Sequence, residues 1–270
     1  MYYCELERFV EEDLGADDDS NGIVPPVGAR AKIVCKEDGV LAGLEEACEV
    51  FGYFCVDTAN LRDDGQPVRK GEVIMELSGA ADDILRAERL ALNFLGRMSG
   101  IATLTARCLE RAGGVRVAAT RKTTPGFRAF EKKAVKLGGG DTHRYDLSSA
   151  VMIKDNHIAI MGLEGAIAAA KRAASFTKKI EVEVESVEDA VKAAKLGVDI
   201  VMFDNMKPAR IAEGVKKVRK VNAKIIVEAS GGIDLSNIKE YAKTGVDVVS
   251  LGALTRNAKW LDFSLDMDVK

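Results

Sequence analysis

The feature that most constrains the fold is an alternation of strand-like and helix-like segments that begins after Gly113 and Gly114. Six short segments, rich in valine, isoleucine and alanine, have the length and composition of buried strands. They cover residues 115–120, 150–154, 180–185, 199–203, 224–229 and 246–251. Because apolar strands that alternate with helices form parallel sheets, this pattern predicts a parallel sheet covered by helices.

The segments between these strands have helical patterns. Residues 163–176 and 186–197 are amphipathic. Ser186 and Asp189 have the spacing of a helix capping box, and Pro208 stands where the first turn of a further helix is expected. The sequence therefore predicts that helices follow the third and fourth strands directly.

The number of strands limits the possible architectures. Six strands in roughly 150 residues are too few for a complete eight-stranded barrel of about 250 residues, so an open barrel or a doubly wound sheet would fit. Polar residues and glycines at the strand ends favour the barrel, because the carboxyl ends of its strands meet at one mouth. These residues are Arg121, Lys122, Lys154, Glu183, Asp204, Ser230, Gly231, Gly232 and Gly252. We therefore predict an α/β fold with an incomplete, open parallel α/β barrel.

The first part of the chain has a different pattern. Residues 29–42 and 65–77 alternate in the manner of strands. A long helical pattern follows over residues 80–112, with Gly96 and Gly100 expected to loosen its middle. These patterns predict an α/β sandwich as the N-terminal domain.

We therefore expect two domains. Residues 1–112 would form the N-terminal α/β domain with its long helix, and residues 113–259 the barrel. Because the strand-end residues lie in the barrel, it is expected to be the catalytic domain. A C-terminal tail of about residues 260–270 is expected to pack back on the N-terminal domain.

Composition excludes several classes of function. A net charge of -3, with 47% hydrophobic and 30% charged residues, is typical of a globular protein that recognises neither nucleic acid nor membrane by bulk charge. The five cysteines include no CxxC pair, and no basic and apolar leader precedes the first helix-like segment, so reduced thiols and a cytoplasmic location are expected. A clustered Cys and His metal site is not expected, because only two histidines are present.

Residues 121–157 gather positive charge and both histidines of the chain. The cations at issue are Arg121, Lys122, Arg144 and Lys154. Two like charges about 7 Å apart repel by roughly 2.4 kcal/mol at an effective dielectric constant near 20. These cations must therefore either scatter over the surface or converge to bind an anion, and we favour convergence. His143 would be a neutral donor or a cation near a carboxylate, and His157 would have a loop or capping role.

Acidic residues follow the cationic segment. Glu181, Glu183 and Glu185 share one face of a predicted strand, which either looks into the barrel or faces solvent. Asp204 ends the next strand and favours the first alternative. Two carboxylates, Glu183 and Asp204, beside a cationic mouth suit a sugar diol or a Mg²⁺ ion carried by a phosphate ligand.

Small residues end the last two strands. Ser230, Gly231 and Gly232 are expected to lead into a helix, and Gly252 follows the final strand. Backbone N–H groups at such strand ends commonly bind phosphate in barrels. A Ser-Gly-Gly sequence alone is a weak signal that also fits a tight turn, but small residues in both final loops together favour a phosphate site.

With these residues assembled, nearly the whole chain resembles the quinolinate phosphoribosyltransferase family, the decarboxylating nicotinate-nucleotide pyrophosphorylases. The motifs that carry the resemblance are EDGVLAG (37–43), ERLALNFLGRMSGIAT (88–103), TRKTTPG (120–126), GGGDTHR (138–144), IKDNH (153–157), EVEVES (181–186), FDNM (203–206), EASGGI (228–233) and LGALT (251–255). Two departures occur. Residues 11–22 lack the Gly-Asp-x-Thr pattern usual in the family, and Arg256-Asn257 stands where many members have His-Ser.

The resemblance implies an enzyme of de novo NAD biosynthesis. It would transfer the phosphoribosyl group of phosphoribosyl pyrophosphate (PRPP) to quinolinate, with Mg²⁺, and form nicotinate mononucleotide, pyrophosphate and CO₂. It also implies a homodimer with shared active sites, or a higher homo-oligomer, in which Arg97 reaches the partner's site. Among the residues that match the family motifs, the resemblance assigns catalytic roles to Lys122, Lys154, Glu183 and Asp204.

The remaining assignments concern the ligands. By resemblance, Arg121, Lys122, His143, Arg144 and Lys154 bind the carboxylates of quinolinate and the pyrophosphate of PRPP. Glu183 and Asp204 bind ribose hydroxyls and Mg²⁺, and Ser230, Gly231, Gly232 and Gly252 bind the 5′-phosphate. Three alternatives stay open: a molybdenum-associated relative acting on another aromatic acid, a nicotinate enzyme without decarboxylation, and a non-catalytic phosphate-binding barrel.

Overall fold

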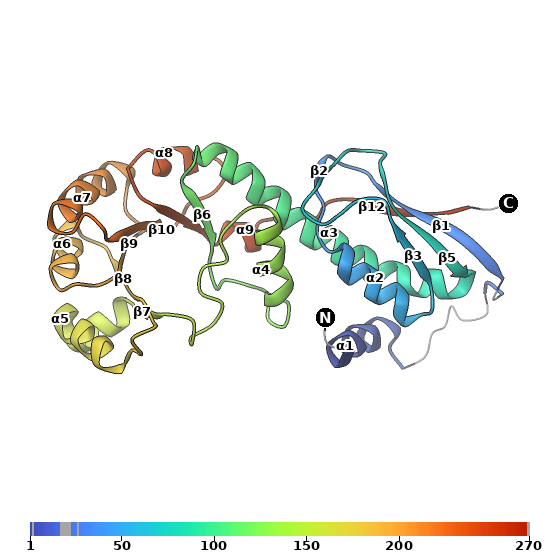
Figure 1. Cartoon of the computed structure of the whole chain (residues 1–270), viewed down its shortest axis with the longest axis horizontal. Coiled ribbons are helices and arrows are strands. Elements are labelled where there is room, and N and C mark those ends of the chain that lie inside the picture. Colours follow the sequence, from blue (N-terminus) through green and yellow to red (C-terminus); the bar gives the residue numbers. More distant parts are fainter. Residues whose placement is uncertain (2, 17–22, 26, 269–270) are drawn as a thin grey trace. The chain divides into compact units, whose positions relative to one another are not determined.

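The computed structural model describes the chain except for residues 2, 17–22, 26 and 269–270 (Figure 1). Part of the segment that departs from the family pattern, residues 17–22, therefore lies outside the described residues. The chain forms two compact units, Met1–Thr103 with Ala258–Lys270 and Leu104–Asn257. The sequence places the boundary at residue 112, whereas the units divide inside the helix α3 (Ala81–Ala112). This continuous helix contains no terminating signal that would mark the division.

The first unit contains an antiparallel sheet of four strands in the order β12-β1-β5-β3. Its elements besides α3 are α1 (Tyr3–Leu14), β1 (Gly28–Cys35), β2 (Gly39–Val40), α2 (Leu44–Tyr53), β3 (Asp57–Asn60), β4 (Pro67–Val68), β5 (Val73–Ala80) and β12 (Phe263–Asp268). The short strands β2 and β4 pair separately. The C-terminal strand β12 lies at the sheet edge, where Phe263 is opposite Cys35 of β1.

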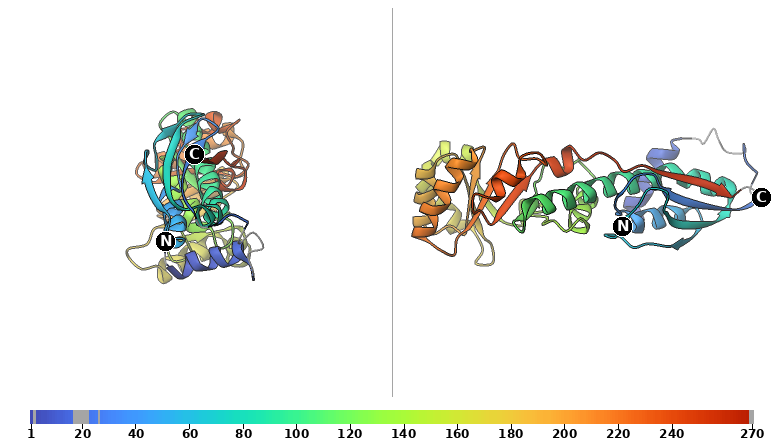
Figure 2. Two further views of the ribbon diagram at one scale, coloured as in Figure 1. Left: turned by 90° about the vertical axis from the view of Figure 1, so that its right-hand side faces the viewer. Right: turned by 90° about the horizontal axis from the view of Figure 1, so that it is seen from above.

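Helix α3 is unbroken through both of its central glycines (Figure 2). A Cβ atom at Gly100 would lie 2.0 Å from the Lys259 carbonyl oxygen, and one at Gly96 would lie 3.0 Å from that of Leu261. The Leu261 N–H also donates to the Gly96 carbonyl at 3.0 Å. The prediction that these glycines loosen the helix is therefore wrong. They instead allow the segment around Lys259 and Leu261 to pass close to the helix backbone.

The second unit is an open sheet of six parallel strands in the order β6-β11-β10-β9-β8-β7. Its strands are β6 (Arg116–Ala119), β7 (Val151–Ile153), β8 (Ile180–Val184), β9 (Ile200–Asp204), β10 (Ile226–Ser230) and β11 (Val248–Leu251). Its helices are α4 (Arg128–Leu137), α5 (Asp155–Ala173), α6 (Val187–Lys195), α7 (Pro208–Val221), α8 (Ile238–Ala242) and α9 (Ala253–Arg256). The helices α5 to α8 lie outside the curved sheet (Figure 1).

The core of this unit lies between the strands and their helices. Val182, Val201, Val227 and Val249 are fully buried at the centres of neighbouring strands. The two end strands, β6 and β7, are not paired with each other in the described part of the chain. The predicted α/β fold with an incomplete, open parallel barrel is therefore confirmed. No helix among the described residues is long and apolar enough to cross a membrane.

Candidate active site

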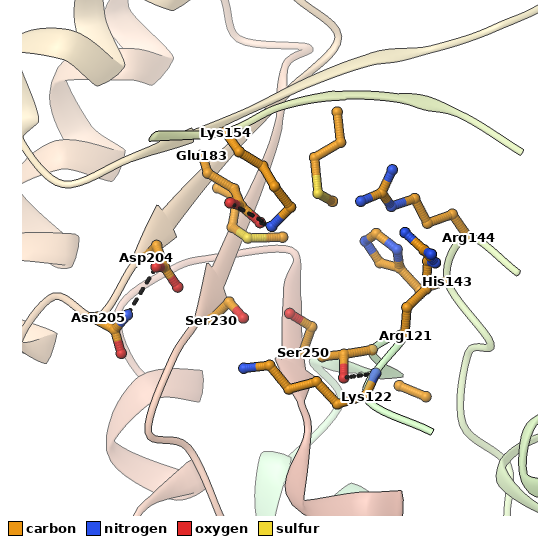
Figure 3. Close-up of a pocket in the computed structure, with 14 residues that line it drawn as sticks. Arg121, Lys122, His143, Arg144, Lys154, Glu183, Asp204, Asn205, Ser230 and Ser250 are labelled. Atoms are coloured by element: carbon orange, nitrogen blue, oxygen red, sulfur yellow. Dashed lines mark hydrogen bonds and ion pairs between the residues drawn. The ribbon is translucent and has the colours of Figure 1, made fainter. Parts of the chain in front are cut away.

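The carboxyl ends of the six strands surround a cavity of about 330 Å³, which we call the mouth cavity. Its lining residues are Ala119, Thr120, Arg121, Lys122, His143, Arg144, Met152, Lys154, Glu183, Met202, Asp204, Asn205, Ser230 and Ser250. Arg121, His143 and Arg144 lie on one side, and Asp204 and Asn205 lie on the opposite side (Figure 3). The four cations predicted to converge therefore do so.

The cationic side of the mouth cavity has unmet capacity to donate hydrogen bonds. Arg121 Nε is buried and has no hydrogen-bond partner among the described residues. Burial lowers the pKa of Arg144, and the charge of Arg121 lowers it further, whereas Glu181 and Glu183 oppose this shift. Two guanidinium groups that repel each other beside a cavity would be stabilised by an anion with oxygen acceptors.

A lysine and a carboxylate from neighbouring strands pair at the mouth. Lys154 follows β7, and its Nζ donates to both carboxylate oxygens of Glu183 on β8, at 2.7 and 2.8 Å. The side chain of Glu183 is 16% exposed. The pairing fixes both side chains in the cavity wall, and each can also contact a ligand.

The opposite wall is formed where β9 ends. Asp204 Oδ2 accepts a hydrogen bond of 2.8 Å from Asn205 Nδ2. Asn205 has a positive φ of 53°, and its N–H donates to the Ser230 carbonyl at 3.0 Å. This turn joins the ends of β9 and β10 and positions the Asp204 carboxylate at the cavity.

Two buried charged residues of α4 hold the loops that carry the cations. Thr124 donates to Glu131 through its N–H and its hydroxyl, each at 3.0 Å. Lys132 Nζ donates to the carbonyls of Thr142 and Arg144. Burial lowers the pKa of Lys132 to about 8, and Arg128 adds to this effect. The sequence analysis identified neither Glu131 nor Lys132, because nothing in their local sequence distinguishes them from the charged side chains of a solvated surface.

The imidazole of His143 lies between two buried glutamates. Its Nε2 is 3.2 Å from Glu228 Oε2 and 3.6 Å from Glu181 Oε2. Burial opposes protonation of His143, but the hydrogen bonds and charges of both glutamates outweigh it and raise its pKa to about 10. Of the two alternatives left open by the sequence, the structure favours the cation near a carboxylate.

The glutamate face of β8 is only partly as expected. Glu181 is 1% exposed and Glu183 lines the mouth cavity, so this face is not a solvated one. Glu185, however, lies beyond the end of β8 and is exposed. The strand ends at Val184 because Ser186 caps the next helix and accepts a hydrogen bond of 3.0 Å from the Asp189 N–H.

The structure brings together the following predicted site residues around the mouth cavity: Arg121, Lys122, His143, Arg144, Lys154, Glu183, Asp204 and Ser230. Gly231, Gly232 and Gly252 follow β10 and β11 directly but do not line it. Arg97 belongs to the other unit, where its Nη1 donates to the Ala258 carbonyl at 3.3 Å.

The helix expected directly after Ser230-Gly231-Gly232 begins later than predicted. Helix α8 starts at Ile238. Between the glycines and the helix, Asp234 forms a side-chain turn, in which its carboxylate accepts from the Ser236 N–H at 2.8 Å. Asp, Ser and Asn favour such local turns over helix, so the glycine turn does not adjoin a helix N-terminus.

Several residues of the site were not singled out from the sequence. The cavity also contains Thr120, Met152, Met202, Asn205 and Ser250, and Glu228 lies behind it. Glu228 and Ser230 alternate along β10, so they share a face as Glu181 and Glu183 do. This alternation was the signal that could have identified Glu228.

The fold and the cavity define an α/β-barrel protein with a cavity lined by cationic side chains at the carboxyl ends of its strands. Comparison with known families narrows this class. The model of the quinolinate phosphoribosyl transferase N-terminal domain matches residues 20–99, and that of the C-terminal domain matches residues 101–266. The chain belongs to the quinolinate phosphoribosyltransferase family.

Individual relatives agree with this assignment. A probable nicotinate-nucleotide pyrophosphorylase [carboxylating] of Methanothermobacter thermautotrophicus is 47% identical, over 97% of each chain. The human nicotinate-nucleotide pyrophosphorylase [carboxylating] is 41% identical, over 90% of this chain and 83% of its own. The crystal structure of NadC from Streptococcus pyogenes has a TM-score of 0.92 and 41% identity, and the match covers 97% of this chain and 95% of that one. The predicted family and transferase activity are thus confirmed. The alternative of a non-catalytic phosphate-binding barrel is wrong.

Proposed function

We propose that the mouth cavity is the active site at which this chain converts quinolinate and PRPP into nicotinate mononucleotide, pyrophosphate and CO₂. The observation that carries the proposal is the separation of charge across the cavity, with Arg121 and Arg144 on one side and Asp204 on the other (Figure 3). The reaction needs both sides, because its substrates are anions and its sugar becomes positively charged in the transition state.

Quinolinate would bind on the cationic side. Its two adjacent carboxylates match the guanidinium groups of Arg121 and Arg144, with His143 beside them. Arg121 Nε, which has no hydrogen-bond partner among the residues that the structure describes, supports this, since a buried donor without an acceptor is costly until a ligand supplies one. Nicotinate has one carboxylate and would leave part of this capacity unused, which is why we favour quinolinate as the substrate.

PRPP would bind toward the opposite wall. Glu183 and Asp204, which line the cavity, would accept hydrogen bonds from ribose hydroxyls. Lys122 and Lys154 would bind the pyrophosphate. The 5′-phosphate would bind near Ser230 and the backbone of the following residues, Gly231, Gly232 and Gly252. Gly231 and Gly232 support this, because their φ values of 90° and 63° turn the backbone sharply beside the cavity.

The residues present also fit Mg²⁺. This ion usually takes one or two protein carboxylates and completes its shell with phosphate and water, and Glu183 and Asp204 end adjacent strands at the cavity. Because Lys154 engages both oxygens of Glu183, we propose Asp204 as the principal protein ligand. The ion would offset pyrophosphate charge when bound.

The chemistry follows from this arrangement. The bond between C1′ and the pyrophosphate oxygen breaks, and its electron pair leaves with pyrophosphate toward Lys122 and Lys154. The pyridine nitrogen then forms the new bond to C1′, while Glu183 and Asp204 favour the positive charge on the sugar. Loss of CO₂ from C2 leaves an electron pair beside the positive ring nitrogen, and a proton completes the new C–H bond.

The assembly and location are part of the same proposal. We propose a homodimer in which Arg97 of one subunit completes the site of the other, which is consistent with its position outside the barrel unit. Association into a higher homo-oligomer would leave this shared site unchanged. A cytoplasmic location fits the five cysteines, all of which are free thiols.

Replacement of Lys122 by alanine tests the assignment of the cavity. The side chain lines the mouth cavity, whereas the loop is fixed through the backbone of Lys122, whose carbonyl accepts from Thr255 Oγ1 at 2.7 Å. The variant should therefore lose turnover and keep its fold. Full activity would refute the assignment.

A further inference from the structure

In the proposed reaction the cluster of His143, Glu181 and Glu228 contributes only a positive charge on His143 beside quinolinate, and the two glutamates have no role. The two carboxylates are 1% and 2% exposed, and one oxygen of each, Oε1, has no hydrogen-bond partner among the described residues. The ligand atoms of the three residues lie within 4.8 Å of one another. A pair of buried carboxylates with unused acceptors is costly unless a positive charge is held beside them.

The cluster separates two cavities. Glu181 and Glu228 line a second cavity of about 300 Å³ at the amino ends of the strands, and His143 lines both this cavity and the mouth cavity. The other charged residues around the second cavity are Arg116, Asp141, Arg144 and Lys179. The glutamates therefore contact the imidazole from behind and are not among the residues that line the mouth cavity.

We propose that Glu181 and Glu228 are positioning residues that hold His143 doubly protonated, so that its second ring N–H is a donor for the anionic substrate. The geometry supports this, because a single atom, Nε2, lies within 3.6 Å of both carboxylates. A neutral ring with its proton on Nε2 would carry a lone pair on Nδ1, which would repel a substrate carboxylate. The proposal rests on the assignment of the mouth cavity to quinolinate.

The backbone also keeps His143 in this position. Its φ is 53°, a left-handed conformation that is uncommon for residues other than glycine, and its N–H donates to Asp141 Oδ1 at 2.7 Å. Lys132 holds the carbonyls on either side of it. Such strain is retained where the surroundings determine the conformation, as is common in binding sites.

The same three residues could instead bind a divalent metal ion. We favour a protonated His143 over a bound metal ion. A divalent ion would add positive charge close to Arg144, which Arg121 already repels. The imidazolium supplies the positive charge that the carboxylates require without an ion. Bound metal is therefore an outcome that the experiment must be able to detect.

Nuclear magnetic resonance of the His143 ring tests the proposal without any need for activity. The chain has two histidines, so a His157→Gln variant leaves His143 as the only imidazole. Glutamine suits position 157, where the present side chain accepts a hydrogen bond of 3.0 Å from the Lys154 N–H. We expect ¹⁵N shifts of an imidazolium from pH 6 to pH 8.5. A neutral His143 ring at pH 7 would overturn the proposal, and this result does not depend on which substrate the enzyme uses.

Kinetics of Glu181→Gln and Glu228→Gln connect the ring to the substrate. Without one carboxylate, the pKa of His143 should fall toward its ordinary value of about 6.5 or below. At pH 8 we expect the KM for quinolinate to rise about 10- to 100-fold with a smaller change in kcat, and the defect to shrink as the pH falls to 6. The KM for PRPP should change little.

Glu185→Gln is the matched control, because Glu185 follows the same strand but is exposed. It should behave as the parent protein does at every pH. A KM defect in the cluster variants that is independent of pH would indicate a structural role and contradict the proposal. Elemental analysis could instead find one divalent ion per chain that is lost in Glu181→Gln. That result would contradict the proposal and show that the cluster binds a metal ion.

Discussion

At the scale of single residues, the cations of the site were predictable and their partners were not. Arg121, Lys122, Arg144 and Lys154 were identifiable because four like charges within residues 121–157 repel one another unless they scatter over the surface or converge on an anion. Glu228 was not, because its role depends on contact with His143, 85 positions earlier in the chain. Pairing across that separation is fixed by the barrel and leaves no local pattern.

Lys122 gives the residue-scale prediction. Lys122→Ala should lower kcat about 100-fold or more, since a cation aimed at a leaving anion acts mainly in the transition state. Steady-state kinetics and the melting temperature measured together would separate catalysis from folding. Lys136→Ala, at an exposed position of α4, is the control and should keep both values near those of the parent.

At the scale of elements, the strands of the barrel unit followed the sequence more closely than its helices did. All six predicted strands occur within about two residues of their expected ends, because alternation with capped helices is a strong local signal. Helix α5 was placed too late. It begins at Asp155, where His157 caps the Lys154 N–H, and it contains a kink at Gly162 with a φ of 68°. The kink interrupts the amphipathic pattern and hides the first two turns.

Two glycines in helices give the element-scale prediction. Gly100→Ala should lower the free energy of unfolding by about 1–3 kcal/mol, because its Cβ would meet the Lys259 carbonyl. Gly52→Ala should raise it by up to about 1 kcal/mol, because nothing lies within 4 Å of that Cβ and alanine favours helix. Chemical denaturation of both variants measures the difference. Equal effects of the two substitutions would contradict the close approach at Gly100.

At the scale of the whole molecule, the sequence predicts two domains that meet at residue 112, and the structure has two compact units that divide inside α3. The change from strand-like to strand-and-helix patterns marks two architectures. The division inside α3 depends on which side chains the helix contacts along its length, and those contacts are not local. The return of β12 to pair with β1 likewise joins residues at opposite ends of the chain.

Arg97 gives the prediction at this scale. If the dimer shares its sites, Arg97→Ala and Lys122→Ala should each be inactive, and a mixed dimer should contain one intact site. Random mixing of equal amounts would restore up to about one quarter of the parent activity. Heterodimers isolated by two affinity tags provide the measurement. An absence of recovery in verified heterodimers would contradict the shared site.

The most direct measurement is product analysis with quinolinate, PRPP and Mg²⁺, and with nicotinate as a parallel substrate. We predict equal amounts of CO₂ and nicotinate mononucleotide from quinolinate, and no nucleotide from nicotinate. Nucleotide from nicotinate alone would keep the fold and the phosphate site but contradict the binding of two carboxylates. Absence of product from both acids would contradict the proposed substrate and direct the search to another aromatic acid.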